Sequence, residues 1–428
     1  KKLKIITSIA VIALISIPIF LKNEKQPLEI VTVSNGMGIK TSLVQVNSED
    51  VIYIRSKFKG AGVRCNPPEQ HGISLVACCM LFDEINGLSR EETTEKKIDL
   101  GIHEFSTFAN DEDFCFHFYI TKDKIIDALT FLSHAFSDMN FSSSYLEYVK
   151  KLYPSIQDVE TSIPQELLRQ RLWNMLYQNS VYGMCDTGSS QSISSITTKD
   201  VQDFVRNTLR RDNLEVVFVG KISRFEIDDY LKILFAGLPE AKEKKSDPMT
   251  PTADLSEETE AVIIRPGMRD VVCTMTGIRI DQLSDMEKAA LYVIIDSLFN
   301  SRTGDFCQGL RKRNIAYDIS YEMVQGDMSN VFSVSACLDK KDLESYKKYL
   351  DEKFAEYQKI LDLKALGKTK NYFIKISNNG FKSLKNLAEK IKDAALPFDE
   401  ITEEILEKVS QKLFQKSLQR TVIIGDIS

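Results

Sequence analysis

Residues 66–82, NPPEQHGISLVACCMLF, contain the transition on which the fold depends: a turn rich in Pro and Gly, followed by an apolar helix that ends at Phe82. A β-branched and aromatic run at 51–58 precedes this turn and is typical of a strand. The same order occurs again in the second half, where a strand-like run at 271–280 leads into a helix that ends at 297–299. The sequence therefore predicts one structural unit that occurs twice.

The ends of the two halves support this duplication. The run LEVVFVGKI at 214–222 has a counterpart in RTVIIGDI at 420–427, and each is an apolar stretch that contains one Gly near its end. We expect both to be the closing strand of a domain. A single offset of roughly two hundred residues relates the helices and the closing strands of the two halves, as in an internal repeat.

Between the halves, residues 239–258 are rich in Pro, Lys, Glu and Thr and poor in large apolar residues, which is the composition of a linker. We therefore predict an N-terminal domain at 27–238 and a C-terminal domain at 259–428.

Strand-like and helical patterns alternate within each half. The expected strands include 114–120 and 331–338, and the expected amphipathic helices are 124–137, 163–178 and 343–361. These patterns predict an α+β fold of two homologous domains, each a mainly antiparallel sheet packed with helices.

The first residues have the pattern of an export segment. Three lysines at positions 1, 2 and 4 precede residues 5–21, a 17-residue stretch without charge that ends before Lys22. A basic flank and an apolar core fit a signal peptide, while 17 residues reach the lower limit for spanning a bilayer. We expect residues 1–26 to be a signal peptide or a membrane anchor, with residues 5–21 as the possible tether. The chain would then be exported, either periplasmic or anchored to the membrane; a buried core helix is the alternative.

Composition excludes some partners. With 43% hydrophobic and 27% charged residues and a net charge of -6, the chain is ordinary globular protein without the dense positive surface that nucleic acid requires. Eight cysteines are scattered without a CxxC pair, so we expect mostly buried thiols rather than a disulfide scaffold; they are Cys65, Cys78, Cys79, Cys115, Cys185, Cys273, Cys307 and Cys337. In an oxidising compartment some of them could pair, but the sequence does not assign the partners.

The helix at 72–82 resembles the zinc helix of the insulinase, pitrilysin and mitochondrial-processing-peptidase family, whose motif is G-x-small-H-x-x-E-H. Aligned on Gly72, Leu75 stands at the first histidine, Cys78 at the general-base glutamate and Cys79 at the second histidine. In the family the histidines bind Zn²⁺ and the glutamate takes a proton from the metal-bound water. Leucine cannot bind a metal and cysteine is a poor replacement for that base, so the resemblance implies a member without a zinc site.

The family's third ligand, a glutamate on a later helix, would fall at 152–157, where no carboxylate occurs; Asp158 and Glu160 lie just beyond. An atypical metal set is the alternative, drawn from Cys78 or Cys79 together with His71 and His103. These residues have no established zinc spacing. His117 lies in an expected strand, and we interpret it and His103 as surface or hydrogen-bonded histidines; His134 is the fourth histidine of the chain. We expect no metal in this chain.

Further positions follow the family pattern. Tyr182, Gly183, Gly188, Thr197 and Asp200 match its first domain and read as scaffold. The segment GLRKRNIAYDI at 309–319 is similar to the family's L-R-E-K-R-G-L-A-Y segment, in which an arginine and a tyrosine hold the substrate backbone. Arg311 and Tyr317 would supply these groups. With Leu310-Arg311 matched to the family's L-R, this chain is one residue short before Tyr317; without a gap, Arg311 would stand at the family's glutamate.

The resemblance implies a catalytically inactive subunit of a metalloendopeptidase. It would form a heterodimer with a zinc-bearing paralogous protease subunit, and it would bind an extended peptide substrate at a sheet edge. Zinc is then expected in the partner. The alternatives are a stand-alone peptide-binding or structural homodimer, and an active metallopeptidase with an atypical site.

Overall fold

The structure is a computed structural model, and it describes residues 30–46, 50–185, 187–240, 253–280, 283–316, 318–326, 329–359, 361–378, 384–385, 388 and 396–427. The export segment predicted at 1–26, its tether at 5–21 and most of the predicted linker lie outside these residues. Of the helices that the structure describes, none combines the length and apolar character that a membrane crossing requires.

The first half forms a six-stranded sheet in the order β1-β2-β6-β3-β5-β4. Only β2 and β6 pair in parallel; the other neighbours are antiparallel. Its strands are β1 (Ile30–Val33), β2 (Lys40–Gln45), β3 (Val51–Lys59), β4 (His103–Ala109), β5 (Asp113–Thr121) and β6 (Leu214–Gly220). Its α-helices are α1 (Ile73–Met80), α2 (Arg90–Asp99), α3 (Ile125–Ser137), α4 (Ser143–Ser162), α5 (Pro164–Leu176), α6 (Ser190–Ser195), α7 (Thr198–Thr208) and α8 (Arg224–Leu234).

The second half repeats this plan in a five-stranded sheet ordered β7-β11-β8-β10-β9. Here β7 and β11 are the parallel pair. Its strands are β7 (Glu260–Ile264), β8 (Val271–Arg279), β9 (Asp318–Gln325), β10 (Asn330–Asp339) and β11 (Gln419–Gly425). Its described α-helices are α9 (Asp285–Phe299), α10 (Asp305–Lys312), α11 (Leu343–Lys359), α12 (Leu363–Asn378) and α14 (Glu403–Leu413).

The two sheets share one topology. In the first sheet the closing strand β6 lies between β2 and β3, the strand that leads into the first helix of that half. In the second sheet the closing strand β11 lies between β7 and β8 in the same way. The positions β2-β6-β3-β5-β4 therefore correspond one by one to β7-β11-β8-β10-β9. The predicted α+β class and the predicted duplication are confirmed, with each sheet mainly antiparallel and one parallel pair in each.

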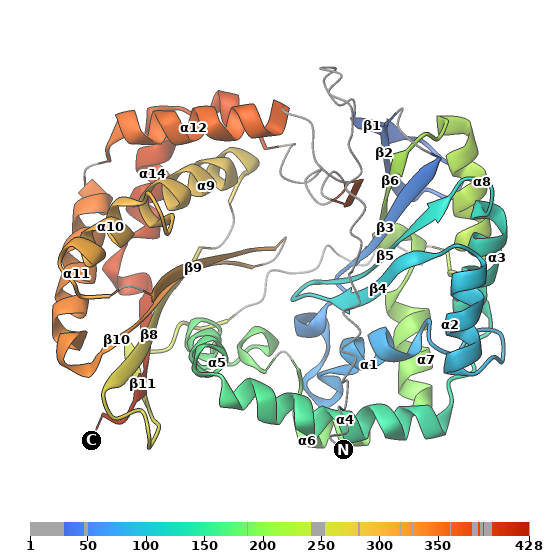
Figure 1. Cartoon of the computed structure of the whole chain (residues 1–428), viewed down its shortest axis with the longest axis horizontal. Helices are drawn as coiled ribbons and strands as arrows, with labels where there is room; N and C mark the ends of the chain where they lie inside the picture. The colour runs from blue at the N-terminus through green and yellow to red at the C-terminus, as the bar shows by residue number, and fades with distance from the viewer. Residues whose placement is uncertain are drawn as a thin grey trace, which may run out of the picture.

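Each sheet has its own helical layer. Apolar residues of α1, α3, α7 and α8 pack on the first sheet in one core, and those of α9, α10, α11 and α14 pack on the second sheet in another. Figure 1 shows the two layers on opposite sides of the molecule, with the sheets between them.

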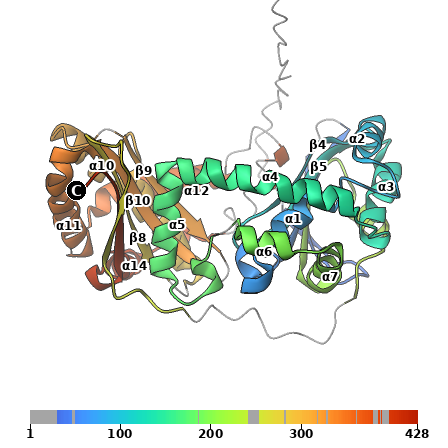
Figure 2. The ribbon, with the colours of Figure 1, turned by 90° about the horizontal axis from the view of Figure 1, so that it is seen from below.

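The opposite face of each sheet contacts a segment from the other half. Helix α5 packs on β8 and β11, where Leu168, Leu172 and Trp173 join the apolar residues of the second sheet. Conversely, Leu384 and Ala388, which belong to the second half of the chain, pack against the first sheet. Figure 2 shows that α4 runs from the first half toward the second, so that α5, which follows it in the chain, lies beside the second sheet.

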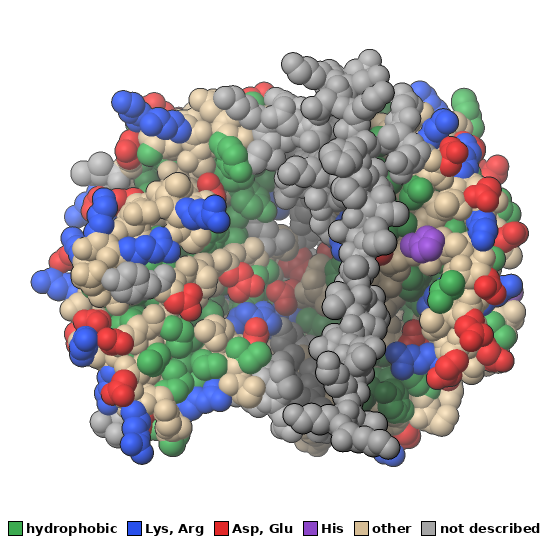
Figure 3. Space-filling model, viewed as in Figure 1, with side chains coloured by type: hydrophobic (Ala, Val, Ile, Leu, Met, Phe, Trp, Pro, Cys, Tyr) green, Lys and Arg blue, Asp and Glu red, His purple; other side chains and the backbone are tan. Residues whose placement is uncertain are grey.

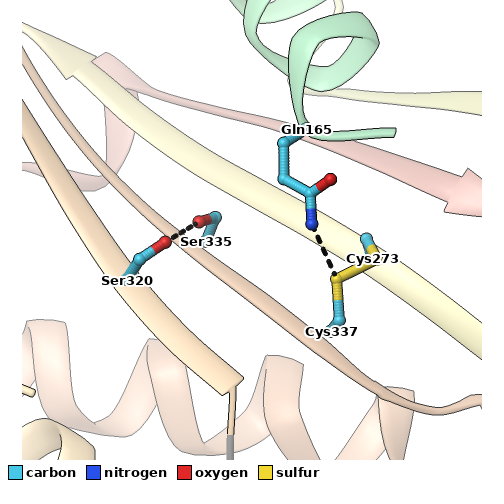
Figure 4. Close-up of a disulfide and its surroundings, with 5 residues drawn as sticks. All are labelled: Gln165, Cys273, Ser320, Ser335 and Cys337. Atoms are coloured by element: carbon cyan, nitrogen blue, oxygen red, sulfur yellow. Dashed lines mark hydrogen bonds between the residues drawn. A yellow bond between two sulfur atoms is a disulfide. The ribbon is translucent and has the colours of Figure 1, made fainter. Parts of the chain in front are cut away.

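Two cysteines differ from the expectation of buried thiols. Cys273 on β8 and Cys337 on β10 are direct partners in the antiparallel register and form a disulfide. Gln165 of α5 donates to the Cys337 sulfur at 3.5 Å, as Figure 4 shows. The sequence could not pair them because 64 residues separate the two positions. The expectation of unpaired thiols was wrong for this pair.

Candidate functional site

Helix α1 begins in a tightly built turn. Gly72 has φ of 96°, and a Cβ there would lie 2.3 Å from the side chain of Ile193. Asn66 donates to the Ser74 hydroxyl at 2.6 Å, and both side chains donate to the carbonyl of Gly62. This turn fixes the start of α1, and only glycine has both the required conformation and the required size at position 72.

The three altered motif positions lie together on α1. Leu75 is half-buried and packs on the first core, while Cys78 is half-buried and Cys79 is exposed. The expectation of a buried thiol was wrong for Cys79, because an apolar run in a sequence does not reveal which side of the helix reaches solvent.

Neither thiol has the properties of the family's general-base glutamate, to whose region the resemblance assigns them. Burial raises the pKa of Cys78 well above its usual value, with Cys79 and Cys115 contributing. Protein atoms around Cys79 also displace water, which raises its pKa, and the Asp83 carboxylate adds to this effect. Both groups are therefore neutral thiols near pH 7, whereas the thiolate is the form that binds metals or attacks a substrate.

A polar cluster surrounds the exposed end of α1. The Tyr145 hydroxyl donates to the Asp83 carboxylate at 2.6 Å and lies 3.3 Å from the Cys79 carbonyl. Arg90 forms an ion pair with the same carboxylate at 3.2 Å. Lys97 donates to the Phe82 carbonyl at 2.7 Å. These contacts bind the end of α1 to residues of neighbouring elements.

The histidines lie apart from one another. His71 contacts the Cys185 carbonyl at 2.5 Å, and His134 pairs with Asp138 at 2.9 Å. His117 is buried on β5, where burial and the nearby cations of Lys385 and Arg55 lower its pKa to about 4. Within the described ranges, no group of three or more His, Cys, Asp or Glu side chains is placed to hold a metal ion. The side chains of Asp158 and Glu160 lie outside the described part.

Strand β4 is an edge of the first sheet and lies beside α1. The Thr107 hydroxyl donates to the Cys78 carbonyl at 2.8 Å, which ties the strand to the altered helix. At its start the strand is irregular: the register shifts between His103 and Ser106, and Glu104 has φ of 48°. Among the described strands, β4 pairs on one side only, so its other row of backbone groups bonds to no described strand.

Arg311 is on the last turn of α10, in the helical layer of the second domain. Its guanidinium donates to the carbonyl of Ser301, in the turn after α9. Tyr317 lies outside the described residues. Their assignment to substrate binding stays a prediction.

Two buried charged residues near the site were missed by sequence reasoning. Arg64 is 2% exposed and pairs with Asp111 at 2.8 Å, and Glu112 is 5% exposed. Arg and Glu are rarely buried, and a run such as Asp111-Glu112-Asp113 in a sequence is typical of a solvated turn. No pattern in the chain distinguishes these two from surface charges.

Charge is mixed over the face drawn in Figure 3, where Lys or Arg side chains alternate with Asp or Glu side chains on both halves. Such a face lacks the continuous positive field that binds a phosphate backbone.

The chain is similar to several known proteins. Residues 195–373 match the family described as the peptidase M16 inactive domain. The mitochondrial-processing peptidase subunit beta of Dictyostelium discoideum is 21% identical over 210 residues, which cover 49% of this chain and 44% of that protein. The match thus spans less than half the length of this curated relative.

Two solved structures share the fold over nearly the whole chain. A peptidase M16 inactive domain from Pseudomonas fluorescens has a TM-score of 0.81 at 19% identity, covering 94% of this chain and 98% of the other. A protease from Helicobacter pylori has a TM-score of 0.80 at 16% identity, covering 94% and 100%. The matched segment and the processing-peptidase relative confirm that the chain resembles the M16 peptidases, and the two solved structures show that it shares their fold.

Proposed function

We propose that this chain is a catalytically inactive M16 subunit that binds an extended peptide and positions it for a zinc-bearing partner protease. One observation carries the proposal: α1, with Leu75, Cys78 and Cys79 at the positions of the family's two histidines and glutamate, lies against the open edge strand β4. The element that would hold a peptide is present, whereas the groups that would cut it are replaced.

The edge strand suits an extended peptide. An open strand offers alternating N–H and C=O groups, and a peptide that adds as a further strand satisfies its own backbone groups at the same time. The bond from Thr107 to the Cys78 carbonyl keeps β4 next to α1. A peptide on this edge would therefore pass close to the altered helix.

The partner in this proposal is a zinc-bearing paralogue. The curated relative is named as a subunit, so at least that M16 protein works with other chains. Arg311 and Tyr317 are proposed to contact the peptide backbone. Zinc would be supplied by the partner.

Export to the periplasm, with residues 1–26 either removed as a signal peptide or kept as a membrane anchor, is part of the same proposal. The disulfide between Cys273 and Cys337 supports it, since disulfides persist mainly in oxidising compartments.

The test of the whole proposal is metal content and peptidase activity, measured on the purified chain alone and mixed with a zinc-bearing paralogue from the same source. We expect no bound zinc in this chain and cleavage only in the mixture. Arg311→Ala should then raise the KM of the mixture, while Lys312→Ala, an exposed neighbour on the same helix, serves as the matched control. Stoichiometric zinc and cleavage by the chain alone would establish the atypical metallopeptidase instead. A stable homodimer that gains no activity from any paralogue would establish the structural alternative.

The peptide site is tested separately by hydrogen exchange of the backbone amides. Adding an extended peptide should slow exchange in β4, while β1, the opposite edge of the same sheet, should be unchanged. Equal protection of both edges, or of neither, would argue against binding at β4.

A further inference from the structure

A buried carboxylate joins the two domains at the tips of two hairpins. Glu112, in the turn between β4 and β5, accepts hydrogen bonds from the Ser329 backbone N–H at 2.7 Å and from the Ser329 hydroxyl at 2.8 Å. Glu112 is 5% exposed and Ser329 is fully buried, although 217 residues separate them in sequence. Figure 1 shows the β9–β10 hairpin pointing toward the β4–β5 hairpin across the centre of the molecule. We call these two bonds the hairpin contact.

The second hairpin is shaped for this carboxylate. A Cβ on Gly326 would lie 1.9 Å from Oε1 of Glu112 and 2.2 Å from its Cδ. Atoms that are not covalently bonded cannot approach this closely, so residue 326 must lack a side chain for the hairpins to adopt this arrangement. The fit between Gly326 and Glu112 is a second observation, independent of the hydrogen bonds, that the two tips are built to meet.

The first hairpin is in turn bound to the segment before α1. The Gly62 N–H donates to the Glu112 carbonyl at 3.0 Å, and the Arg64 N–H donates to the Asp111 carbonyl at 2.9 Å. The Gly62 carbonyl accepts from the Ser74 hydroxyl, in the first turn of α1, at 3.1 Å. A path of short polar contacts therefore runs from Ser329 in the second domain, through Glu112 and Gly62, to the start of the altered helix.

The arrangement in which the two hairpin tips are joined is stabilised by the hydrogen bonds to Glu112. A hydrogen bond to an ionised carboxylate is stronger than a neutral one, and a buried carboxylate that loses its donors carries a large desolvation cost. The contact therefore favours two discrete arrangements, tips joined or tips apart with Glu112 in water, over a continuous range of domain positions.

We propose that Glu112 is a positioning residue that couples the placement of the second domain to α1 and to the edge strand β4. The role of β4 as a peptide site rests on the proposed function, but the coupling itself does not. Separation of the hairpin tips would loosen the 62–66 turn and α1, and closure would fix them.

Hydrogen exchange of the full chain without peptide tests the coupling. Ser329→Ala removes one donor from the second domain and should speed exchange of the amides at 62–66 and 73–80 by about threefold or more, as expected for a local opening made easier. Ser320→Ala is the matched control: it removes a hydroxyl from β9 in the same hairpin, where Ser320 bonds Ser335 as Figure 4 shows, and it should leave those amides unchanged.

A double-mutant cycle of Glu112→Ala and Ser329→Ala gives the second measurement. Their effects on the unfolding equilibrium should be non-additive by about fivefold, while Glu69→Ala, an exposed glutamate, should add independently to Ser329→Ala. Faster exchange confined to 326–331, or additivity in the cycle, would overturn the coupling. Because no peptide is present, this failure differs from loss of peptide protection in β4, which would count against the proposed function.

Discussion

Lys97 shows how a single residue near the altered helix sets a pH dependence. Burial lowers the pKa of its ammonium to about 8, although Asp83 opposes this shift, and Nζ lies 4.4 Å from the centre of the Phe105 ring. An unfolded lysine has a pKa near 10.4, so between about pH 8 and 10.4 the unfolded chain binds more protons than the folded one. The free energy of unfolding contributed by Lys97 must then rise with pH across this window.

We therefore predict that the free energy of unfolding of the natural protein, minus that of Lys97→Met, increases by up to roughly 3 kcal/mol between pH 8 and 10.4 and is flat outside this range. Urea denaturation at a series of pH values measures this difference. Lys96→Met, at an exposed position on the same helix, is the control and should give a flat difference throughout. A difference that falls with pH would show that folding raises the pKa of Lys97 instead of lowering it.

Arg64 carries a prediction about stability. Its buried guanidinium pairs with Asp111, donates to the carbonyls of Tyr182 and Met184, and lies 4.3 Å from the centre of the Trp173 ring. Arg64→Met leaves all these acceptors without their donor, and should lower the free energy of unfolding by about 3–5 kcal/mol.

The matched control for Arg64 is Arg90→Met, since Arg90 also pairs with a carboxylate but is 51% exposed. Exposed ion pairs contribute about 1 kcal/mol or less. Chemical denaturation at neutral pH compares the two variants, and equal losses would contradict a special role for the buried pair.

At this scale the sequence predicted the helix that begins after Gly72, and the family resemblance assigned Leu75, Cys78 and Cys79 to its zinc-motif positions, an assignment that stays a prediction. The sequence did not indicate the exposure of Cys79 or the burial of Arg64 and Glu112. Each of these depends on a neighbour that is distant in sequence, such as Trp173 for Arg64 or Ser329 for Glu112.

At the scale of elements, the disulfide joins the two strands at the centre of the second sheet. Cys273 and Cys337 close a covalent loop across β8 and β10 with a sequence separation of 64. A loop of this length restricts the unfolded chain, and reduction should lower the free energy of unfolding by about 4 kcal/mol. Denaturation with and without reductant measures the effect.

A variant with serine at both positions is the control, because it should be as stable as the reduced natural protein and insensitive to reductant. When the natural protein is alkylated without reductant, mass spectrometry should find Cys273 and Cys337 unmodified, because their sulfurs are bonded to each other. Alkylation of both would contradict the disulfide.

The strands and helices themselves were largely predictable. The run at 114–120 lies within β5, the run at 331–338 lies within β10, and the helix expected at 124–137 matches α3 within one residue. Periodicity identifies an apolar face but not the surface that it covers. The packing of α5 on β8 and β11 could not be predicted for this reason, since the apolar residues of α5 fit a core in either half.

At the scale of the whole molecule, each half contributes a segment that packs on the sheet of the other half, so the core of each sheet includes residues from both halves. Helix α5 precedes the predicted linker, yet it buries Leu172 and Trp173 against the second sheet. The packing is close: a Cβ on Gly277 of β8 would lie 2.6 Å from Leu172. Burial of each such side chain contributes about 1.5–3 kcal/mol, so the halves should hold together without a covalent connection.

We predict that cleavage at a protease site inserted between residues 241 and 252, within the predicted linker, leaves the two fragments associated on size-exclusion chromatography. The same cleaved protein with Leu172→Glu should separate, because a carboxylate would be buried against the second sheet. Leu152→Glu, on the neighbouring helix α4 where Leu152 is 44% exposed, is the control and should stay associated. If the natural fragments separate after cleavage, α5 does not hold the halves together, and the hairpin contact between Glu112 and Ser329 would also be too weak to join two free domains.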